Sequence, residues 1–231
     1  MRRSIYLGIA SVLSLVLIAV LSTPAQAAVW WSSDRWGSWS SNGYTLYNNV
    51  WGSGAGPQTI WANSGTNWGV WADHPNTGGI KSYPNSTKWS GKRISAIGTL
   101  SSDFNVTVPT SGVAFESAYD VWSSDNAYEI MLWMNLYGSV GPLGSYQTTV
   151  GVGGHWWNVF RGSNGSNQVF SFVRTSNISS GTVDIKAICN WLRSQGWFGD
   201  VTIGNVQFGY EITSSTGGKD FVTNNLTITA T

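Results

Sequence analysis

Every second residue from 128 to 134 is apolar, and a glutamate stands among the residues between them. One side of this segment carries only apolar residues, and the other side carries Glu129, Met131 and Trp133. Alternation with period two and one wholly apolar face is typical of an antiparallel strand that is half buried against a core. The segment therefore predicts a strand that presents Glu129 away from the core.

Residues 206–212 repeat this pattern far along the chain, with Glu211 on the side that faces away from a wholly apolar one. A third segment, residues 113–122, places Asp120 and Glu116 together on one side of a predicted strand. The chain has only three glutamates, so two in matched strands are informative. We expect Glu129 and Glu211 to meet on one face of a sheet. We place Glu116 at the rim of that face, in a structural role.

Further short segments with a strand pattern follow one another, separated by clusters of Gly, Asn and Ser. Their ranges are 44–50, 69–72, 93–100, 103–108, 146–152, 156–161, 168–175 and 221–229. Many short strands joined by such turns are typical of a β-sandwich or a jelly roll. The pattern therefore predicts an all-β fold.

One segment, residues 184–195, has apolar residues at helical spacing instead. Asp184 can cap its start, and Gly196 can end it. We expect one short amphipathic helix packed on the outside of the β domain. Cys189 is the sole cysteine and lies on the apolar side of this helix, which predicts a buried thiol and no disulfide.

The N-terminus has the features of a secretory signal peptide. Arg2 and Arg3 precede an uncharged, leucine-rich stretch, and the run from Ala25 to Ala27 supplies an A-x-A cleavage site. We predict a signal peptide at residues 1–27 and a single domain at residues 28–231, secreted and extracellular. An uncleaved membrane anchor is the alternative. No other apolar run is long enough to span a bilayer, so we expect no membrane contact after cleavage.

The amino-acid composition limits which molecules the protein is expected to bind. Charged residues make up 10% of the chain and the net charge is +1, so no basic stripe could follow nucleic-acid phosphates. The two histidines, His74 and His155, do not stand at a metal-ligand spacing, and we expect neither a metal nor another cofactor. A monomer is the default expectation for the oligomeric state.

Aromatic residues are abundant at 14% of the chain, and fifteen of them are tryptophans. Flat aromatic faces bind the apolar C–H faces of sugars, while amide and hydroxyl side chains hydrogen-bond the sugar hydroxyls. This composition favours a polysaccharide as the partner.

Paired carboxyl groups on one sheet face are what glycosidic bond cleavage requires. A spacing of roughly 5–5.5 Å between them indicates retention of configuration, whereas roughly 6.5–9.5 Å leaves room for a water molecule and indicates inversion. Two such groups cannot both ionise easily, so one pKa is pushed upward. One member of the pair should therefore stay protonated near the working pH.

Several long strings then resemble glycoside hydrolase family twelve. They are YEIMLWMNLYGSVGPLGS, GGHWWNVFRGSNGSNQVFSFV and VQFGYEI, with NGYTLYNNVWG and KSYPNS nearer the N-terminus. The resemblance implies a β-jelly roll of two curved antiparallel sheets with a concave cleft, and endo-acting cleavage of β-1,4-glucans with retention. It also implies that Glu129 is the nucleophile, Glu211 the general acid/base, and Asp120 the residue that hydrogen-bonds the nucleophile. We therefore expect Glu211 to be the member of the pair that stays protonated.

Six further residues are candidates for substrate contacts: Trp36, Asn49, Trp51, Met131, Trp133 and Pro142. The first three resemble family positions that line the glycone side of the cleft. The next two share the face of Glu129 by alternation, so they should border the cleavage point. Pro142 belongs to the string GPLGS, which resembles the family's loop across one end of the cleft.

The preferred glucan stays open between cellulose, mixed-linkage β-glucan and xyloglucan. The short connection between Asp120 and Glu129 opens one end of the cleft and affects which branched glucans fit. A jelly-roll xylanase shares the two-glutamate plan and is one alternative to the glucanase. A non-catalytic carbohydrate-binding β-sandwich is the other, although binding alone does not require two carboxyl groups facing each other.

Overall fold

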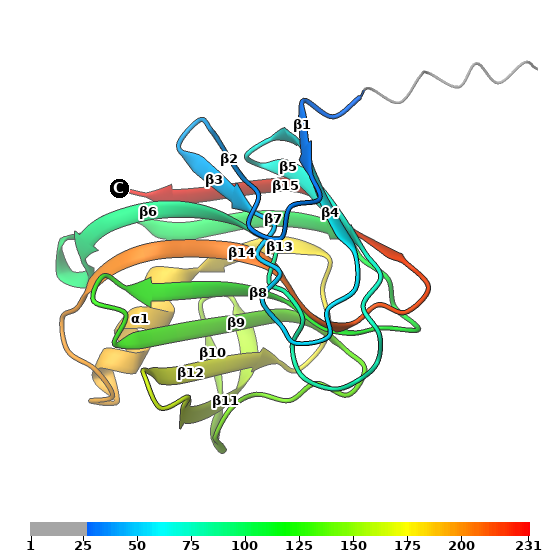
Figure 1. The fold of residues 1–231 in the computed structure, drawn as a ribbon. Helices are drawn as coiled ribbons and strands as arrows, with labels where there is room; N and C mark the ends of the chain where they lie inside the picture. Colours follow the sequence, from blue (N-terminus) through cyan, green and yellow to red (C-terminus); the bar gives the residue numbers. More distant parts are fainter. Residues whose placement is uncertain (1–26) are drawn as a thin grey trace, which may run out of the picture.

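The computed structural model describes residues 27–231, whose strands form two stacked sheets (Figure 1). The predicted signal peptide, apart from its last residue, lies outside the described residues. Neighbouring strands run antiparallel, except β9 and β12, which pair in parallel. The prediction of an all-β jelly roll with one packed helix is confirmed.

The larger sheet has nine strands, and one of its faces packs against the core while the opposite one, here called the cleft face, carries the predicted acids. In spatial order the strands are β10 (Ser145–Val152), β11 (His155–Ser163), β12 (Gln168–Arg174), β9 (Tyr128–Tyr137), β8 (Ala114–Ser123), β14 (Thr202–Ser214), β6 (Asn85–Arg93), β3 (Tyr44–Tyr47) and β2 (Ser38–Ser41).

The smaller sheet has six strands and covers the core from the other side. In spatial order they are β1 (Trp30–Ser32), β4 (Gln58–Ser64), β5 (Asn67–Ala72), β15 (Lys219–Ala230), β7 (Leu100–Thr107) and β13 (Ser180–Asp184).

The core between the sheets is rich in aromatic rings from the apolar sides of the predicted strands. The ring centroid of Phe208 in β14 lies 4.7 Å from that of Tyr119 in β8 and 5.6 Å from that of Phe104 in β7. All three side chains are buried. Such packing commits one face of β8 and β14 to the core, and the other face is therefore left for the polar residues of the site.

The predicted helix is confirmed as α1 (Ile185–Ser194). Asp184 Oδ1 accepts a hydrogen bond of 2.9 Å from the Ala187 N–H, and Gly196 follows the helix with a φ of 68°. The thiol of Cys189 is free and buried, and this burial raises its pKa to about 12. No helix in residues 27–231 is long and apolar enough to cross a membrane.

The predicted strand at residues 93–100 is wrong. β6 ends at Arg93, a 3-10 turn η1 (Ile94–Ala96) follows, and β7 starts at Leu100. The apolar residues Ile94, Ile97 and Leu100 are buried, but they stand three residues apart. That spacing suits a tight turn whose side chains all point one way, not a strand with period two.

Candidate active site

Three neighbouring strands carry the three predicted acids on the cleft face. Glu129 lies on β9, Glu211 on β14, and Asp120 on β8 between them. Glu129 pairs with Trp122 of β8, and Glu211 pairs with Glu116 of the same strand. The structure therefore brings the two glutamates to opposite sides of β8, on the same face of the sheet.

Glu129 is buried and has one neutral hydrogen-bond donor. Asn167 Nδ2 donates to Glu129 Oε2 over 3.0 Å. Burial raises the pKa of Glu129 to about 7, the hydrogen bond from Asn167 opposes this shift, and the charge of Glu211 adds to it. The amide favours the ionised form because it can only donate at this position.

Asn167 was not predicted from the sequence. It lies in the turn just before β12, and β12 runs parallel to β9 with Val169 opposite Glu129. That non-local pairing places the turn beside the carboxyl group. Nothing in the run of Asn, Gly and Ser around residue 167 distinguishes it from an ordinary turn.

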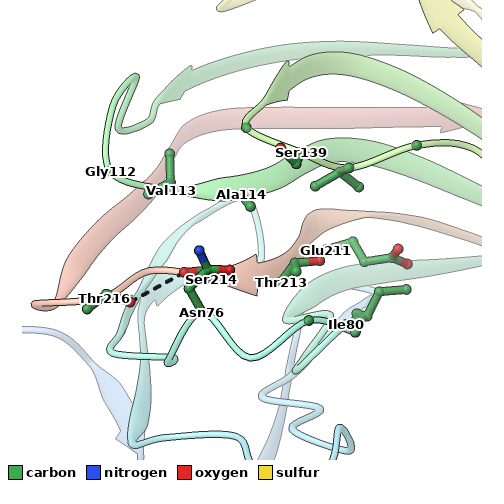
Figure 2. Close-up of a pocket in the computed structure, with 15 residues that line it drawn as sticks. Asn76, Ile80, Gly112, Val113, Ala114, Ser139, Glu211, Thr213, Ser214 and Thr216 are labelled. Atoms are coloured by element: carbon green, nitrogen blue, oxygen red, sulfur yellow. Dashed lines mark hydrogen bonds between the residues drawn. The ribbon is translucent and has the colours of Figure 1, made fainter.

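Glu211 lines a cavity of about 780 Å³ at one end of the cleft face (Figure 2). The cavity walls come from residues 76–80, 112–114, 138–141 and 211–216. Burial raises the pKa of Glu211, and in the pairing of β14 with β8 its direct partner is Glu116. Glu211 thus lies between open space on one side and a second carboxyl group on the other.

Asp120 and Glu116 are more deeply buried than the two predicted catalytic glutamates. Asp120 is 4% exposed and Glu116 is fully covered. Burial raises the pKa of each well above its usual value, and neighbouring carboxylates add to the effect. The prediction that Glu116 lies at the rim of the cleft is therefore wrong. Its side chain is enclosed directly opposite Glu211 because the register of β8 against β14 places it there.

Tyr83 joins the acids from the segment before β6. Its hydroxyl donates to the Ala118 carbonyl oxygen over 3.1 Å, and burial together with the nearby carboxylates raises its pKa. Gly209 permits this approach, since a Cβ there would lie 2.2 Å from the Pro84 carbonyl oxygen. The string KSYPNS contains Tyr83, so the resemblance could have identified it.

Trp36 and Trp51 present large surfaces to solvent, 64% and 47% exposed respectively, as sugar platforms require. Two hydrogen bonds with the backbone of Tyr83 hold Asn49 in place. The side-chain Nδ2 of Asn49 donates to the Tyr83 carbonyl oxygen over 3.2 Å, and the backbone carbonyl oxygen of Asn49 accepts from the Tyr83 N–H over 3.0 Å. These contacts tie the loop of Asn49 and Trp51 to the tyrosine that lies among the carboxyl groups.

Met131 and Trp133 lie on the same face as Glu129, but they are only 7% and 2% exposed. They belong to an apolar cluster on the cleft face, formed with Ala118, Val169 and Val173. They therefore form the floor of the site. Pro142 follows directly after the cavity wall at residues 138–141 and is partly exposed.

The arrangement suits nucleophilic and acid–base chemistry on an uncharged substrate. Two carboxyl groups lie across one strand, in a site dry enough to raise both pKa values. One of them has a permanent amide donor that supports its ionised form. Glycosidic bond cleavage requires two carboxyl groups of this kind, one ionised and one protonated. Residues 27–231 contain no group of three or more His, Cys, Asp or Glu side chains placed to hold a metal ion.

Comparison with known proteins agrees with this chemistry. The profile of glycosyl hydrolase family 12 matches residues 32–231. The xyloglucanase domain of NopAA from Sinorhizobium fredii, solved with cellobiose, has a TM-score of 0.85 and 47% sequence identity, covering 88% of this chain and 100% of that one. Endoglucanase 3 of Trichoderma harzianum has a TM-score of 0.80 and 27% identity, with coverages of 87% and 97%.

A curated relative adds a sequence match of similar extent. The probable xyloglucan-specific endo-beta-1,4-glucanase A of Aspergillus fumigatus is 33% identical over 214 residues, which cover 85% of this chain and 90% of the relative. The fold, the paired carboxyl groups and these matches define a glycoside hydrolase. The chain belongs to glycosyl hydrolase family 12. The predicted family is confirmed, and the non-catalytic binding module is set aside.

Proposed function

We propose that this protein is a secreted endo-β-1,4-glucanase that hydrolyses xyloglucan through a retaining double displacement. The observation that carries the proposal is the pair formed by Glu129, which is buried, and Glu211, which is half-buried, on either side of β8. Family membership supports the endo-glucanase activity, and the xyloglucanase names of several relatives support the substrate.

In the first step, the ionised carboxylate of Glu129 attacks the anomeric carbon of a glucosyl unit. Glu211 donates its proton to the glycosidic oxygen, which leaves as the hydroxyl group of the departing chain. A glycosyl ester on Glu129 results. The hydrogen bond from Asn167 holds Glu129 in position for this attack and favours its charged form.

In the second step, Glu211 is a carboxylate and takes a proton from water. The water oxygen attacks the same carbon from the face that the leaving group vacated, and Glu129 is released. Two inversions restore the original configuration. We assign Asp120 to hydrogen-bonding Glu129, because burial and the charge of Glu129 raise its pKa and keep an O–H available to donate.

Substrate contacts extend from this centre along the cleft face. We assign Trp36, Asn49 and Trp51 to the glycone side, where two exposed indole faces can stack on glucosyl rings. The cavity beside Glu211 provides space for further sugar units or their branches. Pro142, next to the cavity wall, lies in the loop that we assign to one end of the cleft.

A short connection favours a branched substrate. β8 ends at Ser123 and β9 begins at Tyr128, so only residues 124–127 link them. This connection therefore adds no long loop at its end of the cleft face. A glucan that carries side branches needs such open space, whereas an unbranched chain does not.

The substrate assignment predicts a ranking of polymers. Xyloglucan should be cleaved with a kcat/KM roughly tenfold or more above that for carboxymethylcellulose, a difference of about 1.4 kcal/mol in transition-state binding. Mixed-linkage β-glucan should fall between them, and xylan should not be cleaved. Viscosity and new reducing ends, measured together, test this. A fast viscosity drop with few new ends establishes endo-cleavage, and a preference for carboxymethylcellulose or xylan would rule out the assignment.

The hydrogen bond to Glu129 predicts a pH effect. In Asn167→Ala, the pKa of Glu129 should rise because the donor that favours its ionised form is gone. Activity needs the ionised form, so the acidic limb of the profile of kcat/KM should move to higher pH. The maximal value should fall by roughly 10- to 100-fold, the scale of a hydrogen bond to a charged group.

Asn63→Ala provides the matched control for this variant. Asn63 is an exposed residue of β4, in the other sheet, and its side chain donates to Asn67 Oδ1. This variant should therefore leave the acidic limb in place. An unchanged limb in Asn167→Ala would mean that the amide does not stabilise the ionised glutamate.

Localisation rests on the N-terminal segment. We propose that residues 1–27 direct export and are removed, so that the mature chain starts at Ala28 and acts outside the cell as a monomer. Three features support this assignment: the arginines near the N-terminus, the apolar stretch that follows them, and the A-x-A cleavage site.

A further inference from the structure

Glu116 is a third carboxyl group in the site, and the reaction described above does not use it. It lies on β8, directly opposite Glu211 of β14, on the same cleft face. Its side chain is fully buried, whereas the Glu211 side chain reaches the cavity. A completely enclosed carboxyl group beside the general acid requires a physical explanation.

The surroundings of Glu116 do not support a negative charge. Its two carboxyl oxygens accept no hydrogen bond from another residue within the part of the chain that the structure describes. The ionisable groups that face it are Glu211 of β14, Asp120 of its own strand, and Tyr83 before β6. Across β9 its partner is the apolar Leu136. Among residues 27–231, no lysine, arginine or histidine contributes to the shift in its pKa.

An ionised Glu116 would thus be buried without a donor and among other acids, which is strongly unfavourable. A protonated Glu116 is neutral and gains one O–H to donate. Glu211 is its direct partner in the pairing of β8 with β14 and is the nearest residue on that strand that could accept such a hydrogen bond. One proton therefore supplies Glu116 with the partner that it otherwise lacks.

We propose that Glu116 is a positioning residue that stays protonated throughout the reaction and donates a hydrogen bond to the carboxyl group of Glu211. The inference deepens the proposed function and rests on it. When Glu211 gives its proton to the glycosidic oxygen, it becomes a carboxylate in a dry site. The O–H of Glu116 stabilises this carboxylate, while its own proton stays bound to it. Protonated buried carboxylic acids can serve enzymes as hydrogen-bond donors in this way.

The role of Glu116 makes a prediction about the direction of a pH shift. In Glu116→Leu the donor is lost, so Glu211 should hold its proton more tightly. The basic limb of the profile of kcat/KM should move to higher pH, and the maximal rate should fall roughly 10- to 100-fold. In Glu116→Gln the side-chain NH2 can replace the O–H donor. That variant should keep its basic limb within a few tenths of a pH unit of the wild type.

The opposite shift would overturn the proposal. If Glu116 were ionised, either neutral replacement would remove a repelling charge, and both variants would move the basic limb to lower pH. If Glu116 only filled space, the leucine variant would lose stability or rate without any movement of the limb. Both results contradict the proposed hydrogen bond.

Infrared difference spectroscopy gives a second readout that needs no turnover. At mildly alkaline pH, the spectrum of the wild type minus that of Glu116→Gln should contain the carbonyl stretch of a protonated carboxyl group. An ionised carboxylate band in its place would overturn the proposal, even if the leucine variant failed to fold. Failure of the proposed function would look different, because the wild type would then cleave no glucan while the infrared band would still be present.

Discussion

Replacing Glu129 with glutamine is expected to abolish glucan hydrolysis, with kcat lowered by roughly 10⁴-fold or more, the scale of losing a nucleophile in a covalent pathway. The amide keeps the shape of the side chain but cannot attack the anomeric carbon. Asn167 would still have an acceptor in the amide oxygen, so the fold and the binding of substrate should persist. Release of reducing ends from xyloglucan measures the loss.

Two comparisons separate a chemical effect of Glu129→Gln from a structural one. Asp103→Asn makes the same change from acid to amide on an exposed residue of β7, in the other sheet, and should keep full activity. In Glu129→Gly, added azide can enter the space left by the side chain and attack an activated aryl glycoside. The product should be a glycosyl azide of inverted configuration. A retained configuration would place the nucleophile elsewhere.

Replacing Glu211 with alanine is expected to have the second largest effect, and its size should depend on the leaving group. For xyloglucan, whose leaving sugar hydroxyl needs a proton, kcat/KM should fall by roughly 10²- to 10⁴-fold, the usual contribution of general acid catalysis. A dinitrophenyl glycoside leaves without a proton, so the bond-breaking step should be nearly unchanged. The glycosyl ester should then accumulate, because no base activates water.

The kinetic signature of Glu211→Ala is a burst of dinitrophenol followed by a slow steady rate. Azide should accelerate the steady rate and produce a glycosyl azide of retained configuration, since it needs no general base. An equal loss of activity with both substrates would contradict the assignment of Glu211 as the acid/base. The polymer and the aryl glycoside thus report on different halves of the reaction.

The two central glutamates could be located from the sequence because strand alternation is a local property. Over residues 128–134 of β9 and 206–212 of β14, every second residue is apolar. Each glutamate therefore lies on the face of its own strand that points away from the core, whatever the surrounding fold. The helix α1 could be predicted for the same reason. Its spacing, its cap at Asp184 and its end at Gly196 all lie within one short segment.

β6 could not be predicted because its core-facing positions are polar. Ser86 is buried and donates to the Gly65 carbonyl oxygen, and Lys88 Nζ reaches the Ile228 carbonyl oxygen. Polar atoms that find such partners can be buried without an apolar pattern. The missing alternation also allowed the apolar residues after Arg93 to be assigned to a strand of their own.

The surroundings of the acids depend on strand order and register, which are non-local. Glu116 was correctly placed on the face of Asp120, but its burial follows from the pairing of β8 with β14. Asn167 reaches Glu129 because β12 lies parallel beside β9. A turn residue and a distant carboxyl group share no sequence pattern, so their contact becomes visible only in the folded chain.

The most direct test of the central claim is to trap the covalent intermediate on Glu129. A cello-oligosaccharide with fluorine at carbon 2 and fluoride as its leaving group should inactivate the enzyme. The fluorine at carbon 2 slows both steps, but fluoride is a good leaving group and keeps the first step fast enough, so the covalent intermediate accumulates. Mass spectrometry of the digested protein should find one fluorinated oligosaccharide attached to the peptide that contains Glu129. Fragmentation of that peptide should place the label on the Glu129 carboxyl group. A label on Glu211, or no label together with a sugar product of inverted configuration, would contradict the account.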